Sequence, residues 1–138
     1  NPSPMNEHVL KCNLSLVSVF VLNEVEGEQL TGTKIPTAIL DKLLQKYPHA
    51  AAVLTLGSKG AWYAKEDKRA FAPAELVRAV DTTAAGDTFT GYFMRGMLDG
   101  LSPKKSLILA AKAAAIAVSR PGAAPSIPLY AEVTSERN

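Results

Sequence analysis

Two apolar segments that bracket a stretch of helical periodicity constrain the fold of this chain most strongly. The first, SVFVL at residues 18–22, is short and rich in β-branched residues, which is typical of a buried strand. Further along, apolar residues recur at three- and four-residue spacing: Ile39, Leu40, Leu43, Leu44 and Tyr47. This spacing predicts an amphipathic helix over residues 36–47, ended by Pro48. Residues 51–65 then predict a strand, a glycine-containing turn and a second strand.

The second half of the chain adds mainly helices. Short strands are expected around Phe71 and over residues 77–80, followed by a helix after Gly86. Ser102 and Pro103 are typical of a helix start, and an alanine-rich helix is expected from there to about Val118. The order strand, helix, strand, strand, helix, helix predicts an α/β protein with helices packed on a sheet, without sign of a second domain.

Composition excludes several classes of protein. The 138 residues are 47% hydrophobic and 20% charged, which fits a globular chain, and a net charge of +2 argues against nucleic acid or an anionic membrane as a partner. A single cysteine and the lack of an apolar run of roughly 20 residues lead us to expect a soluble cytoplasmic protein. The opening NPSP, without an initiator methionine, leads us to expect a piece of a longer protein.

The segment DTTAAGD, residues 81–87, carries the clearest chemical signal. Ala84, Ala85 and Gly86 leave their peptide N–H groups unshielded directly before a helix, whose positive dipole end also attracts anions. The Asp87 carboxylate lies in the first turn and can reach an anion docked there. This arrangement suits removal of a proton from a hydroxyl that attacks a phosphoryl group. From these residues alone, an Asp87 that merely caps the helix fits equally well.

DTTAAGD closely resembles DTxGAGD, the signature of the ribokinase-like carbohydrate kinases. Further segments fall in that family's order and approximate spacing: NPSP at the start, VLNEVEGEQLTG (21–32), TLGSKG (55–60) and AAIAVSRPGAAPSIP (114–128). The resemblance extends over residues 1–128 and corresponds to the C-terminal half of such a kinase. It implies a Rossmann-like sheet flanked by helices, with residues 1–138 forming the nucleotide-binding and catalytic portion and without the N-terminal sugar-binding half and β lid.

The resemblance also implies a reaction, the transfer of the γ-phosphoryl group of ATP to the primary hydroxyl of a pentose such as D-ribose, giving ribose 5-phosphate. Asp87 would be the catalytic base and the contact to the sugar. The backbone of Ala84, Ala85, Gly86 and Asp87 would form the anion hole, with Gly86 and Asp87 also touching the nucleotide.

Two further motifs imply a site for ATP and Mg²⁺. Asn23 and Glu26 match the family's N-x-x-E, in which the carboxylate helps to hold Mg²⁺ and the asparagine reaches the nucleotide phosphates. The family's nucleotide-binding turn, T-x-G-x-x-G, is matched by Thr55, Gly57, Ser58, Lys59 and Gly60. In isolation, the first motif also fits a solvated acidic turn, and the second also fits a plain hairpin turn.

A monovalent-cation site is implied beside the anion hole. In the family, K⁺ is held there largely by carbonyl oxygens from two loops. The matching positions in this chain are Asp81, Thr83, Ala117, Arg120, Gly122 and Ser126.

The chain departs from the family pattern in two ways. Without the lid and the first strands we expect an exposed apolar sheet edge, and homodimerisation is expected only for a full-length protein. Ala111 and Lys112 stand where the family often has Asn or His near the adenine. The sequence therefore leaves two alternatives open: a related kinase for deoxyribose, fructose or a nucleoside, and a catalytically silent nucleotide-binding fragment.

Overall fold

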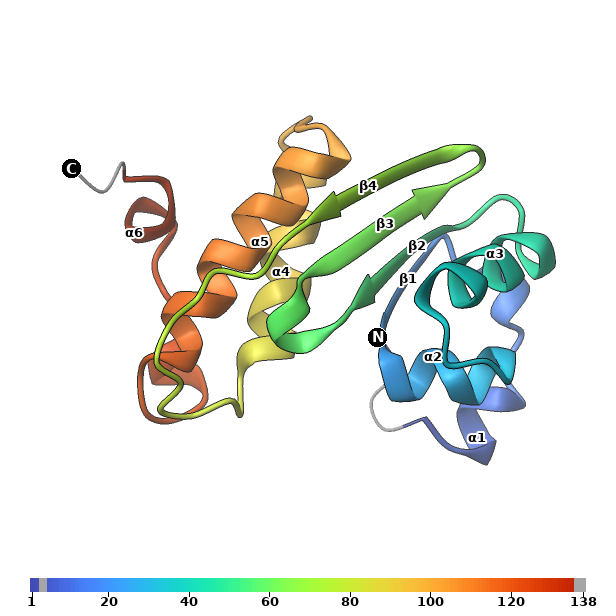
Figure 1. The fold of residues 1–138 in the computed structure, drawn as a ribbon, viewed down its shortest axis with the longest axis horizontal. Helices are drawn as coiled ribbons and strands as arrows, with labels where there is room; N and C mark the ends of the chain where they lie inside the picture. The colour runs from blue at the N-terminus through green and yellow to red at the C-terminus, as the bar shows by residue number, and fades with distance from the viewer. Residues whose placement is uncertain (3–4, 136–138) are drawn as a thin grey trace. The chain divides into compact units, whose positions relative to one another are not determined.

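The computed structural model describes residues 1–2 and 5–135 (Figure 1), so Ser3 and Pro4 of the opening NPSP lie outside the described residues. The chain divides into two compact units. The first comprises residues 1–57 and 61–71, and the second comprises residues 58–60 and 72–138. Within the described part of the chain, no helix combines the length and apolar character needed to cross a membrane.

The first unit is built on a four-stranded sheet in the order β1-β2-β3-β4. The strands are β1 (Val19–Asn23), β2 (Ala51–Thr55), β3 (Ala61–Lys65) and β4 (Lys68–Ala72). β1 pairs with β2 in parallel and β2 pairs with β3 antiparallel, while Figure 1 shows β3 and β4 running in opposite directions. The sheet is thus mixed, and among the described residues β1 is an end strand.

Helices α2 (Glu24–Thr31) and α3 (Pro36–Lys46) pack on this sheet, and the short elements α1 (Glu7–Leu10) and η1 (Leu14–Leu16) precede β1. The amphipathic helix predicted over residues 36–47 is confirmed as α3. Its apolar face forms one core with side chains of β1 and β2: Phe20, Leu22, Ile39, Leu40, Leu43, Leu44, Tyr47, Ala52 and Leu54. This core fixes the carboxyl ends of β1 and β2, where two of the predicted motifs begin.

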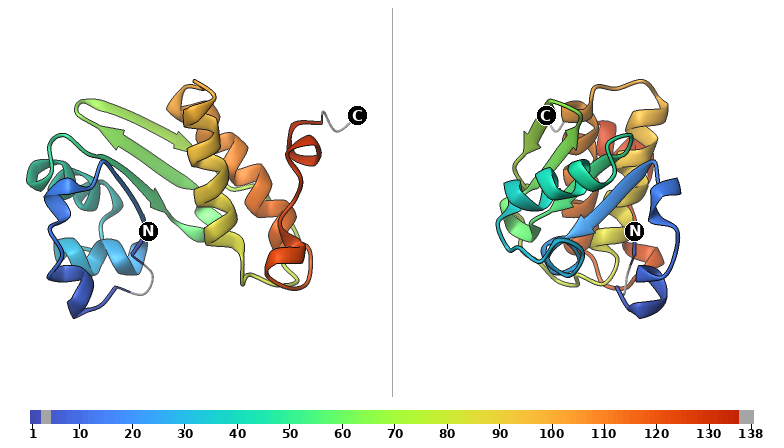
Figure 2. Two further views of the ribbon diagram at one scale, coloured as in Figure 1. Left: turned by 180° about the vertical axis from the view of Figure 1, so that it is seen from behind. Right: turned by 90° about the vertical axis from the view of Figure 1, so that its right-hand side faces the viewer.

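The second unit is a helical hairpin of α4 (Ala85–Leu98) and α5 (Pro103–Val118), followed by η3 (Ala124–Ser126) and α6 (Tyr130–Thr134). Figure 1 and the left view of Figure 2 show α4 and α5 side by side. Gly100 follows the C-cap Asp99 of α4 and has a φ of 76°, which suits glycine, and the Leu101 amide donates back to the Gly96 carbonyl at 2.9 Å. α5 begins as predicted, with Ser102 as the N-cap.

The prediction of a strand over residues 77–80 is wrong. Residues 73–79 are neither helix nor strand, and Val80 is 62% exposed. The amides of Val80 and Asp81 donate instead to the Val118 carbonyl at the end of α5, at 2.7 and 3.1 Å. Because the amides of Val80 and Asp81 already donate to Val118, neither is available to bond to a neighbouring strand. The same bonds attach the start of the DTTAAGD segment to α5.

Candidate phosphate and nucleotide site

The first turn of α4 leaves two backbone donors open, at Gly86 and Asp87, whereas the amide of Ala85, also predicted for the anion hole, is already used. Ala84 is the N-cap and offers no side-chain acceptor, and the Thr88 amide makes the first helical bond, to the Ala84 carbonyl at 2.9 Å. The Ala85 amide donates to Thr82 at 3.2 Å. In the described part of the chain, the amides of Gly86 and Asp87 have no acceptor within the protein. Two N–H groups at a helix N-terminus therefore remain for an anion.

Asp87 is exposed beside these open amides. It occupies the third helical position, where a carboxylate commonly bonds back to the N-cap amide, yet α4 has no side-chain cap hydrogen bond. The capping alternative for Asp87 is thus not realised in this structure. The neighbouring Thr88 hydroxyl, which the sequence reasoning did not single out, is buried and lacks a hydrogen-bond partner in the described structure.

The segment preceding α4 is fastened to the loop after α5 through Asp81. One carboxylate oxygen, Oδ1, accepts hydrogen bonds from the Thr83 amide at 2.9 Å and from its hydroxyl. The other, Oδ2, accepts the Gly122 amide at 3.0 Å. The hydroxyl and the amide of Thr83, together with the Gly122 amide, hold the pKa of Asp81 below its ordinary value, because each stabilises the ionised form.

The residues proposed for a cation site lie in the second unit, on the segment before α4, in the last turn of α5 and on the loop after it. Gly122 and Thr83 meet at Asp81, while the Ala117 carbonyl accepts the Arg120 amide at 3.1 Å. Ser126 is buried at 1% exposure, and its hydroxyl donates to the Ala123 carbonyl at 2.7 Å. The fold thus connects both groups of predicted ligands, and their binding of K⁺ stays a prediction.

The N-x-x-E motif forms a helix start rather than a solvated acidic turn. The Asn23 side chain accepts the Glu26 amide at 2.9 Å, and Glu26 Oε2 accepts the Asn23 amide at 3.0 Å, which closes a reciprocal capping box at the start of α2. Glu26 is only 6% exposed. Its second oxygen, Oε1, takes no part in this box.

The nucleotide turn begins beside this motif in the first unit. Asn23 and Thr55 are register partners at the carboxyl ends of the parallel strands β1 and β2, and the Thr55 hydroxyl donates to the Leu22 carbonyl at 3.3 Å. Ligands of α/β proteins commonly bind at the carboxyl ends of parallel strands. The turn itself is η2 (Gly57–Lys59), in which Gly57, Ser58 and Lys59 are all exposed.

Gly60, in the second unit, has a structural reason to be glycine. Its φ is 116°, and a Cβ added there would lie 2.2 Å from the Ala72 carbonyl oxygen and 2.8 Å from the Pro73 Cα. The predicted site residues are divided between the units. Asn23, Glu26, Thr55 and Gly57 belong to the first, while Ser58, Lys59, Gly60 and the positions from Asp81 onward belong to the second.

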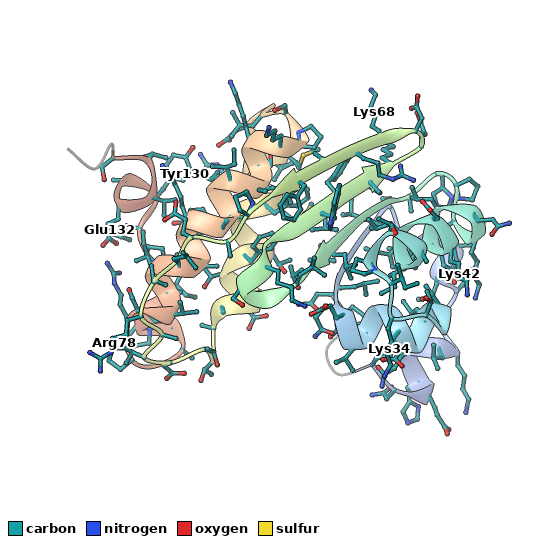
Figure 3. The ribbon with its side chains drawn as sticks, in the orientation of Figure 1. Lys34, Lys42, Lys68, Arg78, Tyr130 and Glu132 are labelled. Carbon is teal, nitrogen blue, oxygen red and sulfur yellow. The ribbon has the colours of Figure 1, made fainter. Side chains whose placement is uncertain are left out.

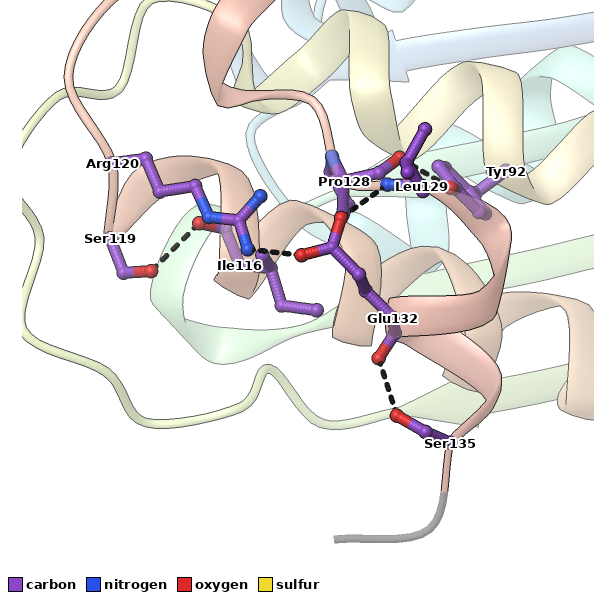
Figure 4. A network of polar contacts seen from close by, with 8 residues as sticks. All are labelled: Tyr92, Ile116, Ser119, Arg120, Pro128, Leu129, Glu132 and Ser135. Atoms are coloured by element: carbon purple, nitrogen blue, oxygen red, sulfur yellow. Dashed lines mark hydrogen bonds and ion pairs between the residues drawn. The ribbon is translucent and has the colours of Figure 1, made fainter.

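Sequence reasoning missed a polar network around α6, drawn in Figure 4. Glu132 accepts from the Arg120 guanidinium and from the Leu129 amide, and the two bonds lower the pKa of Glu132. Figure 3 shows the Glu132 and Tyr130 side chains on this short helix. The only sequence signal for the network is a glutamate three residues after Leu129, which is half of a capping box.

The comparisons with known proteins agree with this fold. Residues 1–129 match the pfkB family of carbohydrate kinases, and the chain belongs to that family. Within it, the chain is 47% identical over 133 residues to a ribokinase of Schizosaccharomyces pombe, covering 91% of this chain and 42% of that protein. The chain thus spans about two fifths of the length of this curated relative.

Two solved structures show the same fold. A ribokinase from Cryptococcus neoformans in complex with ADP aligns with a TM-score of 0.83 at 27% identity, over 96% of this chain and 49% of that one. An Arabidopsis thaliana ribokinase in complex with ribose and ATP aligns with a TM-score of 0.79 at 32% identity, over 87% of this chain and 40% of that one. The predicted family and α/β ribokinase-like fold are confirmed.

Proposed function

We propose that this chain supplies the phosphate-handling part of an ATP-dependent sugar kinase that phosphorylates the primary hydroxyl of a pentose such as D-ribose. The observation that carries this proposal is the exposed Asp87 beside the open amides of Gly86 and Asp87 at the start of α4. Relatives named ribokinase support ribose as the acceptor, and the solved complexes with ADP, ribose and ATP support ATP as the donor.

In the proposed reaction, the Asp87 carboxylate takes the proton of the sugar hydroxyl as that oxygen attacks the γ-phosphorus. The new P–O bond forms while the bond from the γ-phosphorus to the bridging oxygen breaks, and ADP leaves with that electron pair. The amides of Gly86 and Asp87, together with the N-terminal dipole of α4, stabilise the negative charge on the transferring oxygens.

Mg²⁺ fits Glu26, because this ion needs few protein carboxylates when phosphates and water complete its shell. Oε2 of Glu26 is oriented by the Asn23 amide, and Oε1 stays outside the capping box, so one carboxylate oxygen is positioned to act directly or through water. No group of three or more His, Cys, Asp or Glu that could hold a metal occurs in the described part of the chain. The bound ion would neutralise charge on the phosphates.

The remaining predicted residues would hold the nucleotide and K⁺. The exposed turn of Gly57, Ser58 and Lys59 gives ATP a surface without bulky apolar side chains. K⁺ would lie against carbonyl oxygens of the segments around Asp81 and Gly122, which the Asp81 hydrogen bonds already join. This cation would hold the anion-hole segment from behind.

Calorimetric titration of the chain with Mg·ATP tests the proposal. Saturable binding that strengthens when K⁺ replaces Na⁺ is expected. A lack of binding in both buffers would favour the alternative of a silent half-site. Phosphorylation of ribose, deoxyribose, fructose and nucleosides by the complete protein containing this chain would separate the acceptor alternatives.

The catalytic assignment is tested by Asp87→Ala in that complete protein. Removal of the base is expected to lower kcat by about two to four orders of magnitude, with ATP affinity nearly unchanged. Asp99→Asn, which changes a carboxylate at the opposite end of α4, is the matched control and should keep near-normal activity. Retention of more than about a tenth of the activity by Asp87→Ala would exclude Asp87 as the base.

A further inference from the structure

One carboxylate closes the loop between α5 and α6. Oε1 of Glu132 accepts from the Arg120 guanidinium at 2.6 Å, and Oε2 accepts from the Leu129 amide at 2.7 Å (Figure 4). Arg120 lies at the start of this loop and Leu129 at its end. The Glu132 side chain therefore joins the two ends of residues 120–129, which are otherwise mostly exposed and contain only the short element η3.

A second contact fastens the end of the loop to α4. The Tyr92 hydroxyl donates to the Pro128 carbonyl at 2.7 Å, and the Tyr92 ring stacks on Tyr130 with 6.4 Å between centroids and 2° between planes. Burial raises the pKa of Tyr92, so the hydroxyl stays protonated and able to donate at neutral pH. The loop end is thus attached to the same helix that carries Asp87.

Near its start, this loop touches the segment before the anion site. The Gly122 amide donates to Asp81 Oδ2 at 3.0 Å, while Oδ1 of the same carboxylate holds the Thr83 amide. A loop with free ends samples many conformations, and holding one amide against Asp81 then costs conformational entropy. Because Glu132 already joins the ends, less of this entropy remains to be lost when Gly122 meets Asp81.

We propose that Glu132 is a positioning residue for the phosphate site. It touches neither substrate nor cofactor and acts through Arg120 and Leu129, which hold the loop so that Gly122 stays on Asp81. The segment from Asp81 to Asp87 then keeps the conformation that presents its open amides. The effect on phosphate binding rests on the proposed function, but the contact between Gly122 and Asp81 can be measured without nucleotide.

The first test measures amide hydrogen exchange of Gly122 by NMR in this chain, without ligand. Glu132→Ala is expected to speed the exchange of Gly122 by about tenfold, since the amide would leave Asp81 more often. Asp99→Ala is the matched control, because it removes an ion pair of similar length to Arg95 (2.7 Å) and a contact to the Tyr130 hydroxyl (3.4 Å), neither of which joins the two ends of the loop. Glu132→Gln keeps an acceptor oxygen and should give an intermediate rate.

The second test measures Mg·ATP binding by the same variants. Glu132→Ala should weaken binding by about three- to tenfold, while its thermal unfolding midpoint falls no further than that of Asp99→Ala. Unchanged Gly122 exchange, or unchanged binding despite faster exchange, would overturn the positioning role. If Glu132→Ala does not fold, Glu132→Gln decides between the same outcomes. A further outcome is that the unmodified chain binds no Mg·ATP while Glu132→Ala still speeds the exchange of the Gly122 amide. That result would contradict the proposed function and would support the loop contact.

Discussion

Replacement of Gly60 by alanine tests the backbone conformation of the nucleotide turn and its close packing against Ala72. The φ of Gly60 is 116°, which lies beyond the left-handed region that other residues tolerate, and strain of this kind costs about 1–3 kcal/mol. The added Cβ would also lie 2.2 Å from the Ala72 carbonyl oxygen, so backbone must move by roughly 1 Å, and such overpacking costs about 1–3 kcal/mol. We expect Gly60→Ala to lower the free energy of unfolding by about 4 kcal/mol, a large share of typical domain stability.

The matched control is Gly32→Ala at the end of α2. Gly32 also has positive φ, 71°, but an added Cβ would meet nothing within 4 Å, so only the backbone penalty of about 1–2 kcal/mol applies. Urea unfolding followed by Trp62 fluorescence and by circular dichroism measures both variants. The midpoint of Gly60→Ala should lie about 1 M below that of Gly32→Ala. Equal midpoints would refute the close approach of Gly60 to Ala72.

Two further predictions concern the second unit. The pKa of Asp81 is lowered in the folded chain, so its contribution to stability is present above the ordinary pKa of 3.8 and is lost as the pH falls through the lower folded value. Acid unfolding should therefore be less steep below about pH 4 in Asp81→Asn, and parallel curves would contradict the hydrogen bonds from Thr83 and Gly122. Gly96→Ala would place a Cβ 2.8 Å from Ser106 Oγ, and the clash of about 1–3 kcal/mol should outweigh the gain in helix propensity of about 1 kcal/mol. A thermal midpoint at or above that of the unchanged chain would refute this packing.

The parts of the fold that the sequence predicts are those set by local patterns. Two helices are predicted from residues that are close together in the sequence, and both are confirmed. One is predicted by the apolar spacing over residues 36–47, and the other by its start at Ser102 and Pro103. The strand expected over residues 77–80 failed for the opposite reason. Its valines favour extended structure, but the Val80 amide bonds to Val118, which lies far along the chain and leaves no periodic signal.

The same distinction separates the parts of the candidate site. DTTAAGD is a continuous segment, so its small residues and helix start can be predicted together from the sequence. The bond between Asp81 and Gly122 joins residues 41 positions apart, and Glu132 reaches back to Arg120 across a loop. Resemblance to the family placed Asp81 and Gly122 in one site, whereas Glu132 lies beyond the matching segments and was found only in the structure.

Glu26 and Asp87 show how the N-cap residue of a helix affects the hydrogen bonds of a carboxylate in its first turn. Both occupy the third position of a helix, where a side chain can bond back to the N-cap amide. At α2 the N-cap is Asn23, whose side chain accepts the Glu26 amide, and the box closes. At α4 the N-cap is Ala84, which has no side-chain acceptor, and no capping box forms, so the Asp87 carboxylate and the amides of Gly86 and Asp87 stay open.

An absent cap of this kind costs a helix about 1 kcal/mol, and a bound anion can supply the missing acceptors. Replacing Ala84 by a capping residue such as asparagine would provide such an acceptor within the protein. The donors of the first turn of α4 would then become less available to phosphate. The alanine at position 84 therefore leaves the amides of Gly86 and Asp87 available for an anion, which fits the proposed binding of phosphate at the start of α4.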